Sequence, residues 1–301
     1  MAGAVAAQPR LTLQCDAIGP DTTTIRSLDW DRSRFDIEFG LRNGTTYNSF
    51  LVRGERTALI DTSHLKFEGT WLPLLQEQID PKAIDHLIVS HTEPDHSGLI
   101  GHLLDLNPEI EIVGSKVAIQ FLENQVHRPF KSRAVKSGEE LDLGTNPTSG
   151  VAHRFEFLSA PNLHWPDTIF SFDHGTGILY TCDAFGLHYC SDDVFDVDPG
   201  AIAPDFRFYY DCLMGPNARS VRLSIPRFTL IGATTENPSF EVISPLLSLS
   251  EDQVQSMTKL GVESVFLNSM QSWEGEQQVI INQLRNPPAH GGIKLLYITP
   301  E

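Results

Sequence analysis

Residues 87–96 read Leu87-Ile88-Val89-Ser90-His91-Thr92-Glu93-Pro94-Asp95-His96, an apolar run that leads directly into four potential metal ligands. These ligands are His91, Glu93, Asp95 and His96. Pro94 restrains the turn, and the spacing lets alternate side chains converge on one side of a loop. Imidazole and carboxylate together suit first-row transition metals such as zinc, iron or manganese. The stretch therefore predicts a metal site at the end of a strand.

Two later segments place another candidate ligand just after a predicted strand. His164 lies in a loop that prolines restrain on both sides, and Asp183 follows the segment Leu179-Tyr180-Thr181-Cys182. A carboxylate at position 183 could bridge two metals, since each of its oxygens can take one ion. The full candidate set is His91, Glu93, Asp95, His96, His164 and Asp183. This set is too large for one tetrahedral zinc and fits a binuclear site with open coordination positions.

Hydrophobic patterning predicts short strands first and then strands that alternate with helices. Strands are expected over residues 23–28, 35–38, 47–52, 58–61, 84–90, 111–114, 154–159, 169–172 and 178–182. Helices are expected over residues 71–79, 98–106 and 116–126. This order predicts an α/β protein with two sheets between helical layers.

Composition narrows the class of protein. The 301 residues suffice for one large or two modest domains, and 41% hydrophobic with 20% charged residues is typical of a globular protein. The net charge of −17 argues against a nucleic-acid or anionic-membrane surface, because phosphate binding needs concentrated Lys and Arg. No apolar run approaches the length of a membrane span.

The four cysteines indicate a reducing compartment. They form no CxxC pair and are too few for a disulfide scaffold. Pairing of Cys182 with Cys190 is conceivable, but two reduced thiols are expected. No targeting peptide is visible in Met1 to Arg10, so the cytoplasm or the chloroplast stroma is the expected location.

From about Thr23 to Arg222 the chain resembles the metallo-β-lactamase-like domain of flavodiiron proteins, most closely the photosynthetic type of cyanobacteria and green algae. The matching segments are residues 91–96, Asn48-Ser49-Phe50-Leu51-Val52, His164-Trp165-Pro166-Asp167 and Asp183-Ala184-Phe185-Gly186. Glu93 follows the flavodiiron pattern, whereas hydrolytic relatives have His at this position. The resemblance implies an αββα sandwich of the metallo-β-lactamase type over residues 20–225.

The resemblance also implies a di-iron oxidoreductase. His91, Glu93 and His164 would hold one iron, Asp95 and His96 the other, and Asp183 would bridge the two. The family reduces dioxygen to water, or nitric oxide to nitrous oxide. Its electrons come from an FMN on a flavodoxin-like domain that follows, and photosynthetic members add a flavin-reductase domain. An electron-donor flavoprotein or a complete homologue is therefore the expected partner, in a homodimer or heterodimer.

The resemblance ends near residue 225. The family needs one more His on the second iron, and the only later His here is His290, whose surroundings do not match. The FMN and reductase domains are not expected in this chain. Instead, residues 229–240 resemble a short segment of clamp-loader-like AAA+ ATPases, and residues 242–301 resemble the early part of a RecQ-type helicase. Both lack the phosphate-binding loop, so residues 226–301 are expected to be an incomplete α/β appendage without ATPase activity.

Three other functions stay open. A hydrolase on the same fold would use a metal-activated hydroxide, which Glu93 disfavours. The second is a non-catalytic remnant of a flavodiiron protein. Because the last His ligand is missing, activity is expected to be impaired, and the loss could be complete. Nucleic-acid binding by the tail is disfavoured by the acidic charge.

Several further side chains are candidates for supporting roles. His64 could lie beside the site, and Asp167 could either support His164 or cap a turn. The remaining histidines are not expected to take part, namely His86, His127, His153, His174 and His188.

Overall fold

The computed structural model describes residues 10–35, 39–196, 199–224, 264–267 and 295–298. These residues fall into two compact units, one made of Met1–Asp183 with Leu187–Val194 and the other of Ala184–Gly186 with Phe195–Glu301. No helix among the described residues is both long enough and apolar enough to cross a membrane.

The first unit contains a seven-stranded sheet in the order β1-β2-β5-β6-β7-β8-β9. Its strands are β1 (Leu11–Gly19), β2 (Thr22–Asp29), β5 (Thr45–Arg53), β6 (Thr57–Ile60), β7 (His86–Ile88), β8 (Glu111–Gly114) and β9 (Lys131–Ala134). Neighbouring strands among β1, β2, β5 and β6 pair antiparallel, whereas β6, β7, β8 and β9 pair parallel. Parallel neighbours need a crossover connection, which explains why helices appear between strands only after residue 60.

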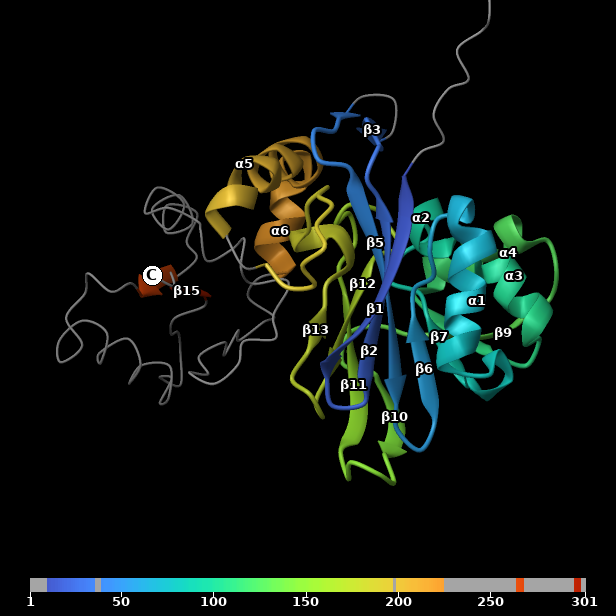
Figure 1. The fold of residues 1–301 in the computed structure, drawn as a ribbon. Coiled ribbons are helices and arrows are strands. Elements are labelled where there is room, and N and C mark those ends of the chain that lie inside the picture. Colours follow the sequence, from blue (N-terminus) through green and yellow to red (C-terminus); the bar gives the residue numbers. More distant parts are fainter. Residues whose placement is uncertain (1–9, 36–38, 197–198, 225–263, 268–294, 299–301) are drawn as a thin grey trace, which may run out of the picture. The chain divides into compact units, whose positions relative to one another are not determined.

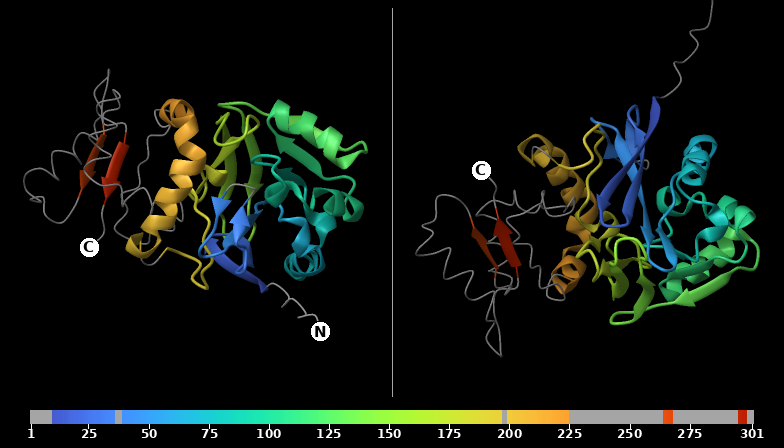
Figure 2. Two further views of the ribbon diagram at one scale, coloured as in Figure 1. Left: turned by 90° about the horizontal axis from the view of Figure 1, so that it is seen from above. Right: turned by 60° about the horizontal axis from the view of Figure 1, so that its bottom comes forward.

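The crossovers are α1 (Glu68–Gln78), the pair α2 (Pro94–Ser97) and α3 (Ile100–Leu106), and α4 (Lys116–Val126). A second, fully antiparallel sheet has the order β10 (Glu140–Thr145), β11 (Ala152–Ser159), β12 (Ile169–Asp173) and β13 (Leu179–Tyr180). Figures 1 and 2 show the helices α1, α3 and α4 on one side of the seven-stranded sheet and strands β10 to β13 on its other side. This unit is thus built as helix, sheet, sheet.

The parallel strands β6, β7 and β8 are buried on both faces, whereas the edge strand β9 is largely exposed. In β6, Leu59 packs under the helices whereas Ile60 packs toward the second sheet, because alternate side chains of a strand point to opposite faces. The same division separates Leu87 from Ile88 in β7. Burial on both sides explains why these strands read as continuous apolar runs in the sequence.

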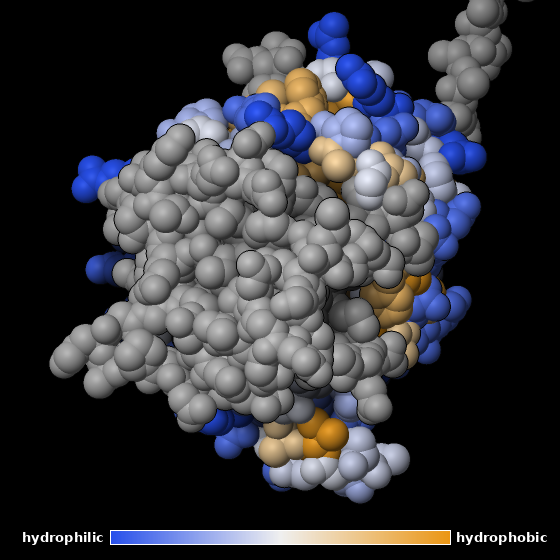
Figure 3. Space-filling model, turned by 90° about the vertical axis from the view of Figure 1, so that its left-hand side faces the viewer, coloured by the Kyte–Doolittle hydropathy of each residue, from blue (hydrophilic) through white to orange (hydrophobic). Residues whose placement is uncertain are grey.

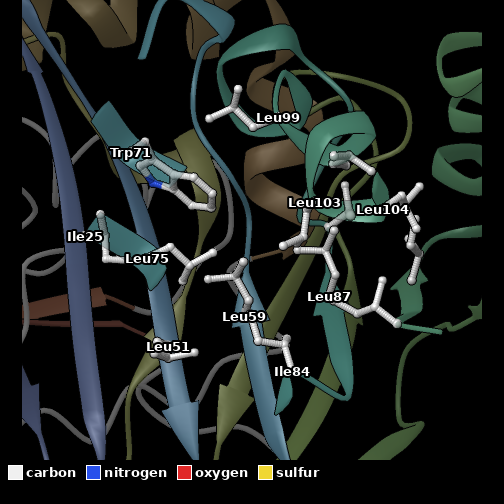
Figure 4. Packing of buried hydrophobic residues seen from close by; sticks show 14 of the residues in the cluster. Ile25, Leu51, Leu59, Trp71, Leu75, Ile84, Leu87, Leu99, Leu103 and Leu104 are labelled. Atoms are coloured by element: carbon white, nitrogen blue, oxygen red, sulfur yellow. The ribbon is translucent and has the colours of Figure 1, made fainter. Parts of the chain in front are cut away.

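The helix-side core is centred on α1. Figure 4 shows Trp71 and Leu75 of this helix beside Ile25, Leu51 and Leu59 of the sheet. The indole Nε1 of Trp71 also donates a hydrogen bond of 3.2 Å to Ser49 Oγ, so its polar atom is satisfied inside the core. The opposite face is filled largely by Phe155 and Phe157 of β11.

The second unit contains α5 (Pro199–Tyr209), α6 (Ala218–Ser224) and a parallel strand pair. The strands are β14 (Ser264–Leu267) and β15 (Leu295–Ile298). Most of the segment predicted to be a helicase-like appendage lies outside the described residues, and so do residues 229–240 and His290.

The predicted elements are confirmed with three differences. Strands 84–90 and 178–182 are shorter than predicted, at His86–Ile88 and Leu179–Tyr180. The first is shorter because Ile84 N–H closes a turn onto Pro81 O, and Ser90 N–H donates to the Asp61 carboxylate at 2.7 Å. The strand predicted at 35–38 is described only as β3 (Arg34–Phe35), paired with β4 (Phe39–Gly40).

Candidate metal centre

The candidate ligands all lie on loops that follow strands. His91 and Glu93 come after β7, and Asp95 and His96 lie in α2, which Pro94 begins. His164 lies in the loop between β11 and β12, and Asp183 lies just after β13. Strands bring their loops together at one edge, so residues 70 to 90 positions apart in the sequence become neighbours.

Asp183 stands between two groups of these side chains. Its Oδ2 lies 3.1 Å from His91 Nε2 and 3.4 Å from His164 Nε2. Its Oδ1 lies 3.0 Å from His96 Nε2 on the other side. The two oxygens of one carboxylate therefore face different imidazoles.

Glu93 and Asp95 complete one group each. Glu93 Oε2 lies 2.9 Å from His164 Nε2 and 3.8 Å from His91 Nε2, whereas Asp95 Oδ2 lies 3.7 Å from His96 Nε2. Ligand atoms of His91, Glu93, His164 and Asp183 all lie within 4.8 Å of one another, as expected of donors around a single ion. Asp95 does not belong to such a group, although it adjoins His96.

Buried polar atoms in this cluster lack hydrogen bonds. They are both ring nitrogens of His91, Glu93 Oε2, Asp95 Oδ1 and His164 Nε2. The atoms approach one another closely without hydrogen-bond geometry, because they point toward shared positions. A buried donor set of this composition is costly without cations and fits first-row metal ions.

The charged side chains of this cluster strongly shift one another's pKa values. Burial opposes ionisation of Asp183, but His96 and His91 hold the pKa of this carboxyl well below its usual range. Burial also opposes the charged form of His164, yet the carboxylates of Asp183 and Glu93 raise its pKa to about 10. Positive charge is thus strongly favoured at this position.

The pKa of Asp95 is raised, whereas that of Asp183 is lowered. Burial, together with the negative charges of Asp183 and Glu93, raises the pKa of Asp95 to about 7 against the opposing effect of His96. The pKa of a carboxyl rises this far when its negative charge is not balanced by its surroundings. A further cation at this position would therefore favour the ionised form of Asp95.

Two aspartates, Asp61 and Asp167, contact the segment of residues 90–96, which carries four of the candidate ligands. Asp61 Oδ2 lies 3.0 Å from His96 Nδ1, and its Oδ1 accepts from Ser90 N–H at 2.7 Å. Asp167 Oδ2 accepts from both the N–H and the hydroxyl of Thr92, at 2.8 and 2.7 Å. Asp167 therefore supports the loop of His91 and Glu93 through Thr92, and its other oxygen, Oδ1, makes no hydrogen bond.

The site lies beside side chains that sequence reasoning missed. His188 is held by Thr45 Oγ1 at 3.0 Å and by a ring contact of 4.1 Å with Phe35, and burial lowers its pKa to about 4. The negative charges of Asp183 and Glu93 oppose this lowering of its pKa. Its position five residues after Asp183 was the one available signal.

His64 and the cysteines on either side of Asp183 lie close to the candidate ligands in the sequence. His64 accepts from Lys66 N–H at 3.1 Å and stacks against Tyr47, so it caps a short helix and is not one of the grouped donors. Cys182 and Cys190 are free thiols, as expected. The six candidate ligands do come together, and their role as ligands stays a prediction.

A family model described as "ODP family beta lactamase" matches residues 45–220. The chain belongs to this family. Diflavin flavoprotein A 1 of Synechocystis sp. is 61% identical over 225 residues, covering 75% of this chain and 38% of the relative. The chain therefore spans less than two fifths of the length of that flavoprotein.

Solved structures agree with this assignment. A metal-soaked Flv1 flavodiiron core from Synechocystis sp. has a TM-score of 0.73 at 27% identity, covering 96% of this chain and 72% of that chain. Rubredoxin oxygen:oxidoreductase from Desulfovibrio gigas has a TM-score of 0.70 at 24% identity, covering 95% and 71%, and shows the fold alone. The flavodiiron resemblance and the metallo-β-lactamase-like fold are confirmed. Neither the family model nor these relatives support the AAA+ and helicase resemblances of the tail.

Proposed function

We propose that this ODP-family chain is an oxidoreductase domain that binds two iron ions and reduces dioxygen to water, or nitric oxide to nitrous oxide. The observation that carries the proposal is the placement of Asp183, whose two oxygens face separate groups of imidazoles. A bridging carboxylate is what a pair of ions needs and a single ion does not. Two iron ions held there would together supply electrons for the reduction of a diatomic molecule.

The residues divide into two positions. His91, Glu93 and His164 would hold the first ion and Asp95 and His96 the second, with Asp183 shared. Glu93 and Asp95 add negative charge that favours the ferric state, and imidazoles suit iron in either state. Asp61 and Asp167 orient the ligands without touching the ions.

Turnover would need a supply of electrons and protons. Reduction of one dioxygen to two waters consumes four electrons and four protons, so a reduced flavoprotein must deliver electrons repeatedly. A flavin carried by a partner chain in a dimer, with FMN as its cofactor, is the donor that this family relationship favours. The proposed setting is the cytoplasm or the chloroplast stroma.

The test is metal content followed by gas consumption. The purified chain is loaded with ferrous iron under anaerobic conditions, and the iron is counted against an Asp183→Ala variant. About two irons per chain, lost in the variant, support the proposal. Oxygen consumption with a chemically reduced flavin as donor then tests turnover, and a chain that holds one iron or none would contradict the di-iron site.

A hydrolase is the competing outcome of a parallel assay. The zinc-loaded chain is tested against an ester and a β-lactam, with Asp183→Ala as the control. Turnover that requires Asp183 and zinc, together with no oxygen consumption by the iron-loaded chain, would replace the redox proposal. An inactive chain that nevertheless holds two irons would indicate a non-catalytic remnant.

A further inference from the structure

We propose that Thr62 is a positioning residue for the second metal position, because it fixes the backbone of His96. The inference rests on the proposed two-metal site, in which His96 would be a ligand. Thr62 is completely buried and directly follows Asp61, after the end of β6. The two neighbours contact the same histidine, Asp61 at the ring and Thr62 at the main chain.

The break between helices α2 and α3 leaves backbone groups that need partners. Helix α2 ends at Ser97 and α3 begins at Ile100. The last carbonyls of one helix and the first N–H groups of the next have no partner within their helices. The carbonyl of His96 and the N–H of Leu99 are two such groups, and Leu99 is completely buried. Buried backbone groups of this kind are satisfied elsewhere in the protein.

Thr62 supplies the partner of both groups. Its N–H and its hydroxyl each donate to His96 O at 2.7 Å. The same hydroxyl oxygen accepts from Leu99 N–H at 3.2 Å. A hydroxyl has one hydrogen to donate and lone pairs to accept, so this side chain uses both functions at once. Three hydrogen bonds from one residue thus hold residues 96–99 against the end of β6.

Thr62 is itself anchored in the core. Its carbonyl accepts from Ser49 Oγ at 2.8 Å, and Ser49 Oγ accepts from Trp71 Nε1 at 3.2 Å. Ser49 and Trp71 are both completely buried. The hydrogen bonds therefore run without a gap from helix α1 to the backbone of His96, and supports of this kind hold a ligand in one direction.

Fixing both ends of His96 determines where its other ring nitrogen points. With Nδ1 facing Asp61 at 3.0 Å and the carbonyl held by Thr62, Nε2 lies 3.0 Å from Asp183 Oδ1. The direction of this donor is set before an ion arrives, which lowers the cost of ordering it on binding. Loss of the Thr62 hydroxyl should therefore affect the ion at His96 and spare the other.

The test compares two substitutions with cobalt(II) as the probe and the full chain under anaerobic conditions. Thr62→Val keeps the shape of the side chain but removes the hydroxyl, whereas Thr62→Ser keeps the hydroxyl and removes a methyl group. We expect Thr62→Val to weaken binding of one cobalt ion by about tenfold and to change its visible ligand-field absorption. This ion should be the one that His96→Ala loses. Thr62→Ser should restore both the affinity and the spectrum.

Thr22→Val is the matched control. Thr22 is also a buried threonine whose hydroxyl donates to a backbone carbonyl, that of Pro20 at 2.9 Å, at the turn between β1 and β2. Its substitution should leave the binding of both cobalt ions unchanged.

Several outcomes would overturn the role of Thr62. One is a Thr62→Val chain that binds both ions with the affinities and spectrum of the unmodified chain, and another is equal weakening of both ions. A third is loss of one ion in Thr62→Ser, which retains the hydroxyl, and this result decides even where Thr62→Val fails to fold. An unmodified chain that binds fewer than two cobalt ions would overturn the two-metal site and the role of Thr62 together.

Discussion

Asp61 orients the imidazole of His96, one of the proposed metal ligands, and is not itself a candidate ligand. Its carboxylate faces His96 Nδ1 at 3.0 Å, so the opposite nitrogen, Nε2, is left to face Asp183. Asp61→Asn keeps the shape but substitutes an amide for the charged acceptor. We expect metal affinity to fall by about 10- to 100-fold, measured by competition with a chelator.

Asp85→Asn is the matched control for this change. Asp85 also follows a turn and accepts a backbone hydrogen bond, from Thr57 N–H at 2.7 Å, but it belongs to the far end of β6 and β7. Its substitution should leave metal affinity unchanged. Equal losses in both variants would show that Asp61 acts only through general stability.

Metal binding should release protons. Against the effect of burial, Asp183 and Glu93 raise the pKa of His164 to about 10, and Cys182 and Asp183 hold the pKa of His91 and His96 well above the usual range. These imidazoles are therefore charged at pH 7 and must lose a proton to bind an ion. We expect affinity to rise between pH 6 and pH 9 and acid to be released on loading, as read with an indicator dye. Affinity that falls over this range would contradict the ligand assignment.

The ligands could be predicted from the sequence because they form a dense motif beside apolar strands. Asp61 and Thr62 carry no such signal, since their contacts with His96 depend on how distant loops meet. His188 was assigned no role for the same reason. A lone imidazole shows its environment only once Thr45 and Phe35 surround it.

At the scale of elements, α2 is fitted against the loop after β6 through Gly98. A β carbon at this position would lie 2.4 Å from Pro94 O and 2.9 Å from both Leu65 N and Ser63 O, all of them backbone atoms. Gly98→Ala should therefore displace α2 together with Asp95 and His96. We expect a loss of about 1–3 kcal/mol in the free energy of unfolding and weaker metal binding, measured by denaturant titration and cobalt binding.

Gly101→Ala is the control, in the neighbouring helix α3. A β carbon there meets nothing within 4 Å, so the substitution should be neutral or stabilise by up to about 1 kcal/mol. Similar destabilisation in both variants would exclude close packing as the cause.

A buried charge network joins β11 and β12 to the turn between β1 and β2. His153 is fully buried, with Nδ1 at 2.8 Å from Asp173 Oδ2 and Nε2 at 3.4 Å from Asp21 Oδ2. Burial opposes its charge, but Asp173 and Asp21 raise the pKa of His153, whereas His153 contributes to a lowered pKa of Asp173.

The sign of the pH effect follows from these directions. A raised pKa of His153 stabilises the fold below the ordinary value of about 6.5, and this contribution is lost as pH rises through the folded pKa. His153→Gln should cost about 3–5 kcal/mol near pH 6, because it leaves the buried carboxylate of Asp173 and the partly buried one of Asp21 without their cation. Denaturant titrations at pH 6 and 9 should show the difference from the unmodified chain shrinking at the higher pH. His174→Gln, at an exposed pair with Glu156, should show no such dependence.

Elements with strong patterns could be predicted almost to the residue. Strand Glu111–Gly114 and helix Lys116–Val126 begin and end where expected, because a β-type run meets Gly114 and Ser115 caps the helix through its hydroxyl. Strand β1 was not predicted. Its half-buried residues Gln14, Cys15 and Asp16 give no clear alternation, and its pairing with β2 supplies the structure that local preference does not.

At the scale of the whole molecule, the negative net charge limits which ligands the surface can bind. The net charge is −17, and Figure 3 shows hydrophilic residues over much of the coloured part of one face, with only small hydrophobic patches. We expect no measurable affinity for duplex DNA even at low salt, tested by fluorescence anisotropy with a labelled duplex. Binding that weakens steeply with added salt would restore the nucleic-acid hypothesis.

The placement of every candidate ligand beyond the end of a strand has a consequence for evolution. Folding energy is concentrated in strands buried on both faces, whereas His91, Glu93, His164 and Asp183 lie beyond the strand ends. Substitutions among them therefore change reactivity with little penalty in folding. A lineage can drift from one chemistry to another, for example by exchange of Glu93 for the His of hydrolytic relatives, while the architecture is inherited unchanged.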